Sequence, residues 1–321
     1  MRAACIALLL AALSCSSKKE TRLPEVENLV LRCAFKEGLV RSYRFKAVLD
    51  SPAAGPMSSG RNLSISWDQK VAALKGGGSA LIESRISDVA FETDDESPSK
   101  GELSAAIQKA LKGAAFTFEV SPRGEVSSAG GTETDWEKAF GPYFEKNGTP
   151  PDRRGFIEDM ARLNFSRDKI LSILTLPFIS LPEGPVGGQS QWEQRRKAAI
   201  FGIGADAGLL YSVQEFSRLE DETTALKIAV ESTSIAGSCA LSIPSNAMPV
   251  AMEVSIAEGK MEGEIFIDPS GAALLKLTER YAVTVEAKAG LPSLKPGETV
   301  DGSAAGVKMP IELDLSLELI E

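Results

Sequence analysis

The sequence contains no histidine among its 321 residues. Histidine is the commonest general base of enzymes and the commonest side-chain ligand of metal ions. Its absence excludes the Ser-His and Cys-His mechanisms of nucleophilic catalysis, together with every metal site built on imidazole. Whatever the chain does, it does without the chemistry that an imidazole supplies.

Cysteine is scarce, with four residues in the whole chain. Cys5 and Cys15 lie at the extreme N-terminus, so Cys33 and Cys239 remain for the body of the protein. In an oxidising compartment two such cysteines can form a disulfide. Two buried free thiols explain them equally well, and the sequence leaves both interpretations open. Two cysteines without histidine or further thiols do not make a metal site.

The apolar run at the N-terminus is too short to cross a bilayer. It covers residues 3–13 after the positive charge of Arg2, whereas a spanning helix needs about 20 residues. This order is typical of a secretory signal. Residues 12–15 (ALSC) resemble the lipobox of bacterial lipoproteins, although the leucine lies two residues before the cysteine and the usual spacing is three. The resemblance implies cleavage before Cys15 and attachment of a diacylglyceryl group, with fatty chains such as palmitate, to its thiol.

The predicted lipid on Cys15 determines where the protein works. Two or more acyl chains anchor a protein stably, because each buried methylene contributes roughly 0.8 kcal/mol. Ser16, where aspartate would follow in a different sorting signal, favours the outer membrane, facing the periplasm. Residues 16–24 are polar and reach at most about 30 Å, so we expect the domain to lie close to the bilayer. An ordinary signal peptide, cut elsewhere, is the alternative.

Positive charge is in the minority. The sequence has 35 basic and 44 acidic side chains, and removal of residues 1–14, which carry only Arg2, takes the net charge from −9 to −10. An acidic surface is repelled by phosphate backbones and by anionic lipid headgroups. The charge therefore argues against a nucleic-acid partner and against a second membrane-binding face beside the lipid on Cys15.

The sequence is rich in period-two alternation of apolar and polar residues, which is typical of strands with one buried face. The clearest examples are residues 63–71, 275–285 and 311–319. Turn sequences lie between such segments: 121–124 (SPRG) and 268–271 (DPSG) place proline second and glycine fourth, where the glycine can adopt a positive φ. The pattern favours an antiparallel sheet with one covered face.

Helical spacing is concentrated between two strand-rich blocks. Residues 134–137 have the spacing of a capping box, Thr149 and Pro150 open a second helical segment, and Ser166 is placed to cap a third. A further short helix is expected at 104–111. We divide the chain into a signal peptide (1–14), a lipidated tether (15–27), a first β-rich half (28–132), a helical segment (133–180) and a second β-rich half (181–321).

The two β-rich halves resemble each other. The step from Leu74 to Ala80 equals that from Leu219 to Ala225, and each half carries a Pro-x-Gly turn. We interpret this as a degenerate internal duplication, with chance similarity between hairpins as the alternative. The predicted fold class is α+β, mainly β: long antiparallel strands in a curved sheet or partial barrel, with duplicated halves and a helical segment between them.

Four segments resemble a family of uncharacterised bacterial envelope lipoproteins with a β-rich domain of unknown function. They are residues 29–38 (LVLRCAFKEG), 113–124 (GAAFTFEVSPRG), 181–192 (LPEGPVGGQSQW) and 268–271 (DPSG). In the family the third segment usually reads Gly-Asp-x-Trp at its end, whereas here three residues separate Gly188 from Trp192. The resemblance implies a lipoprotein location and a β-rich fold. Because its motifs are turns and strand starts, it transfers no active site.

No motif in the chain supports catalysis. Residues 166–169 (SRDK) match the Ser-x-x-Lys of penicillin-recognising enzymes, but the companion motifs are missing and a serine here fits a helix cap. Residues 202–208 (GIGADAG) resemble a nucleotide loop, but a strand follows, so we interpret them as a loop before that strand. Residues 92–96 lack the ligand spacing of a calcium loop. We expect no enzyme, no catalytic residue, no metal and no cofactor.

Two functions fit a lipid-anchored, β-rich domain. A curved sheet with aliphatic faces can enclose a hydrophobic ligand, which predicts a non-catalytic binding or carrier protein. The alternative is a structural or assembly protein of the cell envelope that acts through contacts with a partner protein. A cavity large enough for an acyl chain would favour the carrier, and a filled interior would favour the assembly protein.

Overall fold

The structure is a computed structural model that describes residues 23–50, 61–93, 98–200, 203–243, 250–290 and 307–320. The predicted signal peptide, Cys15 and most of the predicted tether lie outside the described residues.

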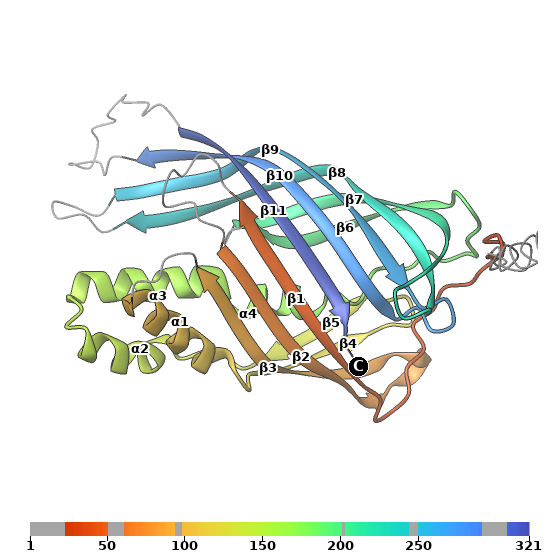
Figure 1. Cartoon of the computed structure of the whole chain (residues 1–321), viewed down its shortest axis with the longest axis horizontal. Helices are drawn as coiled ribbons and strands as arrows, with labels where there is room; N and C mark the ends of the chain where they lie inside the picture. The colour runs from red at the N-terminus through yellow and green to blue at the C-terminus, as the bar shows by residue number, and fades with distance from the viewer. Residues whose placement is uncertain are drawn as a thin grey trace, which may run out of the picture.

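The strands form one open antiparallel sheet of eleven strands (Figure 1). Its order is β5-β4-β3-β2-β1-β11-β10-β9-β8-β7-β6, so β5 and β6 are the edges and the first and last strands meet in the middle. The strands are β1 (Val40–Asp50), β2 (Arg61–Leu74), β3 (Ala80–Thr93), β4 (Ala115–Val120), β5 (Val126–Gly131), β6 (Gln191–Ile200), β7 (Ile203–Arg218), β8 (Thr224–Ile243), β9 (Val250–Ile267), β10 (Leu274–Gly290) and β11 (Val307–Leu319). The predicted mainly-β fold is confirmed, while the duplication stays a prediction.

Of the four α-helices that the described residues form, three gather at one end of the sheet, and the fourth, α4, lies farther along it behind the strands (Figure 1). The four are α1 (Pro98–Leu111), between β3 and β4, and α2 (Trp136–Lys146), α3 (Pro151–Phe165) and α4 (Arg167–Leu174), all between β5 and β6. Each predicted helix is present. The capping box is displaced by one residue, because Asp135 rather than Thr134 is the N-cap of α2 and accepts a hydrogen bond from Lys138 N at 3.1 Å.

The sheet is strongly curved. Arg196 on β6 and Glu279 on β10 lie four strand positions apart, which in a flat sheet would be about 19 Å. Their side chains nevertheless meet at 2.6 Å. The contact requires the inner faces of these strands to turn toward each other, as the bent ribbons of β6 to β10 show (Figure 1).

The hydrophobic core lies on the concave face of the sheet. Along β7 every second residue from Ile203 to Val213 is buried, and Leu313 and Leu317 are buried on β11. The same core takes in Leu31 from the N-terminal segment and residues from the helices. Its largest fully buried side chains include Trp67, Tyr43, Tyr211, Tyr281, Phe118 and Phe140.

Two local predictions were wrong. Residues 203–208, which we predicted as a loop, form the start of β7, because Ala205 and Ala207 point inward and are buried, and Gly204, Asp206 and Gly208 take the alternate positions. At the turn between β9 and β10, the positive φ belongs to Ala272 (46°) and not to Gly271. At both places the prediction relied on glycine, as a sign of a loop in the first case and of a positive φ in the second.

Candidate functional site

The space inside the curved sheet is occupied by the segment that links the two edge strands. Its helix α4 buries Ile170, Leu171 and Leu174. The side-chain amide of Gln69 on β2 donates to the carbonyl of Leu174 at 2.6 Å, and α4 also contacts β6. Since β2 and β6 lie seven positions apart in the sheet, α4 crosses the concave interior from one side to the other.

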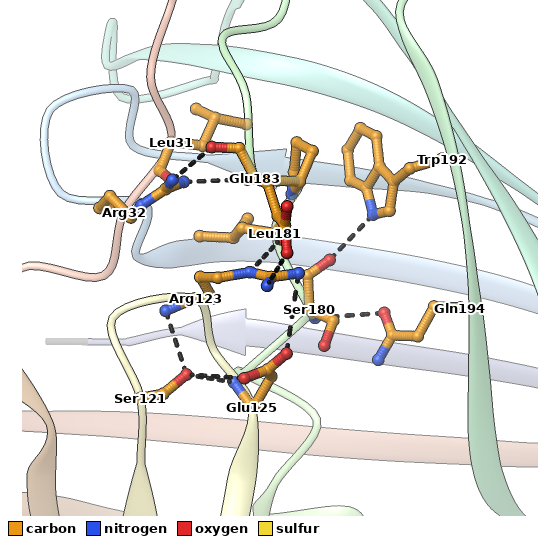
Figure 2. A network of polar contacts seen from close by, with 11 residues as sticks. Leu31, Arg32, Ser121, Arg123, Glu125, Ser180, Leu181, Glu183, Trp192 and Gln194 are labelled. Carbon is orange, nitrogen blue, oxygen red and sulfur yellow. Dashed lines mark hydrogen bonds and ion pairs between the residues drawn. The ribbon is translucent and has the colours of Figure 1, made fainter.

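Directly after α4, a network of polar contacts joins the two edges of the sheet (Figure 2). On one side, the backbone N–H of Leu181 donates to the carbonyl of Arg123, in the turn between β4 and β5, at 2.7 Å. On the other, the indole of Trp192 on β6 donates to the carbonyl of Ser180 at 2.8 Å. The N–H of Ser180 in turn donates to Gln194 Oε1 at 3.1 Å. We call these five residues the clasp.

The N-terminal segment, residues 26–34, reinforces the clasp. Leu29 pairs with Val186 through two backbone hydrogen bonds of 2.8 Å, and the N–H of Cys33 donates to the carbonyl of Pro122 at 2.7 Å. The segment lies at the end of the sheet opposite helices α1 to α3 (Figure 1). The segment thus contacts the β4–β5 turn at one edge of the sheet and Val186, shortly before β6, at the other edge. It therefore links the two edges at that end of the sheet.

A buried ionic cluster on the concave face joins β6, a strand that α4 contacts, to β10. Nη2 of Arg196 donates to both carboxylate oxygens of Glu279, at 2.7 and 2.6 Å, and to the hydroxyl oxygen of Tyr281 at 2.9 Å. The Tyr281 hydroxyl donates to Glu279 Oε2 at 2.9 Å. Glu279 is only 2% exposed. Such a pair is costly to desolvate, so its partners must remain together.

The cluster keeps its charges because each partner compensates the other. Burial by itself would lower the pKa of Arg196, but the nearby Glu279 carboxylate raises this pKa well above its usual value. Burial and the same carboxylate raise the pKa of Tyr281. The guanidinium therefore stays charged, and the Tyr281 hydroxyl stays protonated, at neutral pH.

Tyr211 on β7 lies at the border of the cluster. Its ring stacks on Trp192 of the clasp, with centroids 5.2 Å apart and planes 9° from parallel. Burial raises the pKa of its hydroxyl to about 12. This hydroxyl, and Nε and Nη1 of Arg196, are buried without a hydrogen-bond partner among the described residues. The site therefore offers spare hydrogen-bond donors inside an apolar enclosure.

The cysteines considered in the sequence are not brought together. Cys33 and Cys239 are both free thiols: Cys33 contacts the β4–β5 turn, whereas Cys239 lies near the far end of β8, next to Val254 of β9. Burial raises the pKa of Cys33 to about 11. In the structure these two cysteines are therefore free thiols and form no disulfide with each other. Cys15, the predicted lipidation site, lies outside the described residues.

Sequence reasoning missed Arg196, Glu279 and Tyr211. A signal for Glu279 was present, because it interrupts an otherwise apolar inward face between Leu277 and Tyr281. A charged residue at an inward position of a strand needs a buried partner. No comparable signal marked Arg196, since the inward side of its strand carries polar residues as well.

Three further findings concern the rest of the described residues. A hollow of about 370 Å³ lies across β9, β10 and β11 and is lined largely by exposed residues, among them Glu258, Lys260 and Glu312. In the described part of the chain, no three His, Cys, Asp or Glu residues are grouped to hold a metal ion. Within the same residues, no helix has the length and apolarity to span a bilayer.

Residues 81–271, from β3 to the turn after β9, match the family described as "Family of unknown function (DUF6263)". The chain belongs to the DUF6263 family. The resemblance inferred from the four sequence segments is thereby confirmed as far as a domain of unknown function. No curated protein matches this DUF6263 chain.

Solved structures give only distant likenesses to this DUF6263 protein. A structure of lipovitellin, described for its lipid–protein interactions, has a TM-score of 0.42 and 14% identity over 89% of this chain and 25% of that one. The chain thus spans about a quarter of the lipovitellin chain. OmpF of Salmonella typhi, in complex with daunomycin, has a TM-score of 0.25 and 8% identity over 87% of this chain and 97% of that one.

Proposed function

We propose that the protein is a non-catalytic binding or carrier protein for a hydrophobic ligand, held to a bacterial membrane by lipid on Cys15. One observation carries the proposal. The apolar concave face of a single curved sheet is covered by a short inserted helix and an irregular segment, not by a second sheet. A cover of this kind can be displaced without breaking the strand pairing of the sheet.

The cover is α4 with residues 175–186, and it occupies the place that an acyl chain would take. A helix of eight residues is only marginally stable by itself, and lids are drawn from the least stable parts of a fold. The other helices retain contacts of their own if α4 moves, because Trp136 of α2 packs against Phe165 at the end of α3, with ring centroids 6.3 Å apart. We therefore expect the ligand to enter by displacing α4.

Native mass spectrometry of the protein extracted from membranes should reveal a lipid that copurifies. Burial of an acyl chain on the concave face stabilises the complex by roughly 0.8 kcal/mol per methylene, enough to survive gentle extraction. The denatured mass is the internal control, because acyl groups on Cys15 are covalent and persist, whereas a bound ligand is lost. A ligand-free native mass in several independent preparations would rule out the carrier.

The lipid anchor has its own test. Labelled palmitate should enter the wild-type protein, and Cys15→Ser should abolish the label and move the protein from the membrane fraction to the soluble fraction. The matched control is Cys33→Ser, which removes a partly buried thiol of the folded domain and should leave both label and fractionation unchanged. Membrane association of Cys15→Ser at the wild-type level would contradict the anchor.

A structural or assembly role at the envelope is the second candidate. It is favoured by the described residues of the concave face, which pack against one another and against α4. In this case function would reside in the surface and the interior would be permanent core. A ligand-free native mass, together with one reproducible partner crosslinked in cells, would favour this role over the carrier.

A further inference from the structure

The unpaired polar groups on β6 and β7 need a physical explanation. Nε and Nη1 of Arg196 and the hydroxyl of Tyr211 are buried on neighbouring strands without a partner among the described residues. The guanidinium and the Tyr211 hydroxyl are close enough to interact electrostatically. A buried donor without an acceptor loses its hydrogen bonds to water and gains nothing in return. Three such atoms lie on the side chains of Arg196 and Tyr211, and each calls for a partner.

All three groups can donate a hydrogen bond, and the two guanidinium groups can do nothing else. A guanidinium has five N–H donors and no acceptor, and only those on Nη2 are used, by Glu279 and Tyr281. The Tyr211 hydroxyl retains its proton because burial raises its pKa to about 12. The missing partner must therefore supply oxygen lone pairs. Carbonyl, ester and carboxylate oxygens all meet this requirement.

Charge separates these acceptors. The cluster is already neutral, because Glu279 compensates Arg196 at 2.6 Å. A carboxylate would add an uncompensated negative charge to an interior that excludes water, which is strongly unfavourable. A carbonyl oxygen adds no charge and has two lone pairs, enough to accept from the guanidinium and from Tyr211 at once. The neutral acceptor is the better match.

The position of the donors agrees with an acyl lipid. They lie on β6 and β7, and β6 is a strand that α4 contacts. The inward neighbours on β7 are small, with Ala207 directly opposite Arg196. We propose that Arg196 and Tyr211 bind the carbonyl oxygen of an acyl ester, whose hydrocarbon chain lies along the concave face after α4 is displaced. This inference rests on the proposed function and names the chemical class of its ligand.

The test compares three probes with chains of 18 carbons: glycerol monooleate, oleate and 1-octadecene, which offer an ester, a carboxylate and no oxygen. Binding is measured by native mass spectrometry of the mature, acylated protein released from detergent micelles. Tyr211→Phe should weaken binding of glycerol monooleate about threefold to tenfold, the worth of one neutral hydrogen bond, and leave octadecene unaffected. The matched control is Tyr43→Phe, another buried tyrosine of the concave face, which should bind all probes like the wild type.

Each contrary outcome has a separate meaning. Equal binding of glycerol monooleate by wild type and Tyr211→Phe would overturn the ester site but leave a hydrophobic carrier in place. Tighter binding of oleate, weakened by Tyr211→Phe, would overturn the neutral acceptor. Failure of all three probes to bind would remove the proposed function and this inference together. The urea midpoint of Tyr211→Phe should equal or exceed that of the wild type, and a lower midpoint would show that the hydroxyl is already partnered within the protein.

Discussion

Glu279→Gln should lower the free energy of unfolding by about 3–5 kcal/mol. The substitution keeps the size of the side chain but removes its charge, so the guanidinium of Arg196 is left uncompensated in the interior. Arg196 is almost fully enclosed, with 13% of its side chain exposed, and water cannot replace the carboxylate. Urea unfolding followed by far-ultraviolet circular dichroism should show a lower midpoint at an unchanged slope.

Two comparisons make this result specific to the buried pair. Asp314→Asn breaks an exposed ion pair between Asp314 on β11 and Arg280, which lies on β10 as Glu279 does; the paired atoms are 2.8 Å apart. This substitution should lower the free energy of unfolding by less than about 1 kcal/mol. The double substitution of Arg196→Met with Glu279→Leu removes both charges and should recover most of the stability lost in Glu279→Gln. Equal losses for Glu279→Gln and Asp314→Asn would contradict the description of the cluster as buried and mutually dependent.

Gly124→Ala should be nearly as destabilising as Glu279→Gln. We expect it to lower the free energy of unfolding by about 3–4 kcal/mol, because it combines backbone strain with a steric clash. Gly124 has a φ of 78°, which an alanine adopts only with strain. An added Cβ would also lie 2.1 Å from the carbonyl oxygen of Ile179, so the clasp would have to open. Urea unfolding measures the total effect, and accelerated hydrogen exchange at Leu181 N–H would report the opening of the clasp itself.

Gly38→Ala is the matched control for the clasp. Gly38 has almost the same φ, 79°, but an added Cβ there meets no atom within 4 Å. In this variant the free energy of unfolding should therefore fall only by the cost of placing an alanine at positive φ, about 1–2 kcal/mol. Hydrogen exchange at Leu181 should stay unchanged. If both variants lost the same stability, the close approach of Gly124 to Ile179 would have no energetic role.

Local pattern predicted those elements whose inward side chains are mostly apolar. Residues 311–319 and 275–285 alternate clearly, and they lie in β11 and β10 as expected. Strand β6 was not singled out, because its inward residues Trp192, Gln194 and Arg196 serve the clasp and the ionic cluster instead of an aliphatic core. The strand that carries most of the candidate site is thus the one with the weakest sequence signal.

The order of the strands in the sheet could not be predicted from local sequence patterns, for a different reason. Alternation specifies that a strand has a buried face, but it does not specify its neighbours. Antiparallel neighbours such as β9 and β10 are joined by a short turn and could be paired from the sequence. The pairing of β1 with β11 and the contact of Arg196 with Glu279 depend on curvature of the whole sheet, which no short segment encodes.

The central place of β1 beside β11 has a consequence for how the protein folds. Tyr43 pairs with Leu319, so one of the two partners of β1 is β11, which is synthesised after all the other described strands. Until then β1 to β5 and β6 to β10 are two separate hairpin arrays, each with an unpaired edge that invites association with other chains. Contacts between such distant residues also form slowly, because a long loop must be closed first. A nascent chain of this protein should therefore depend on protection from aggregation until β11 joins the two arrays.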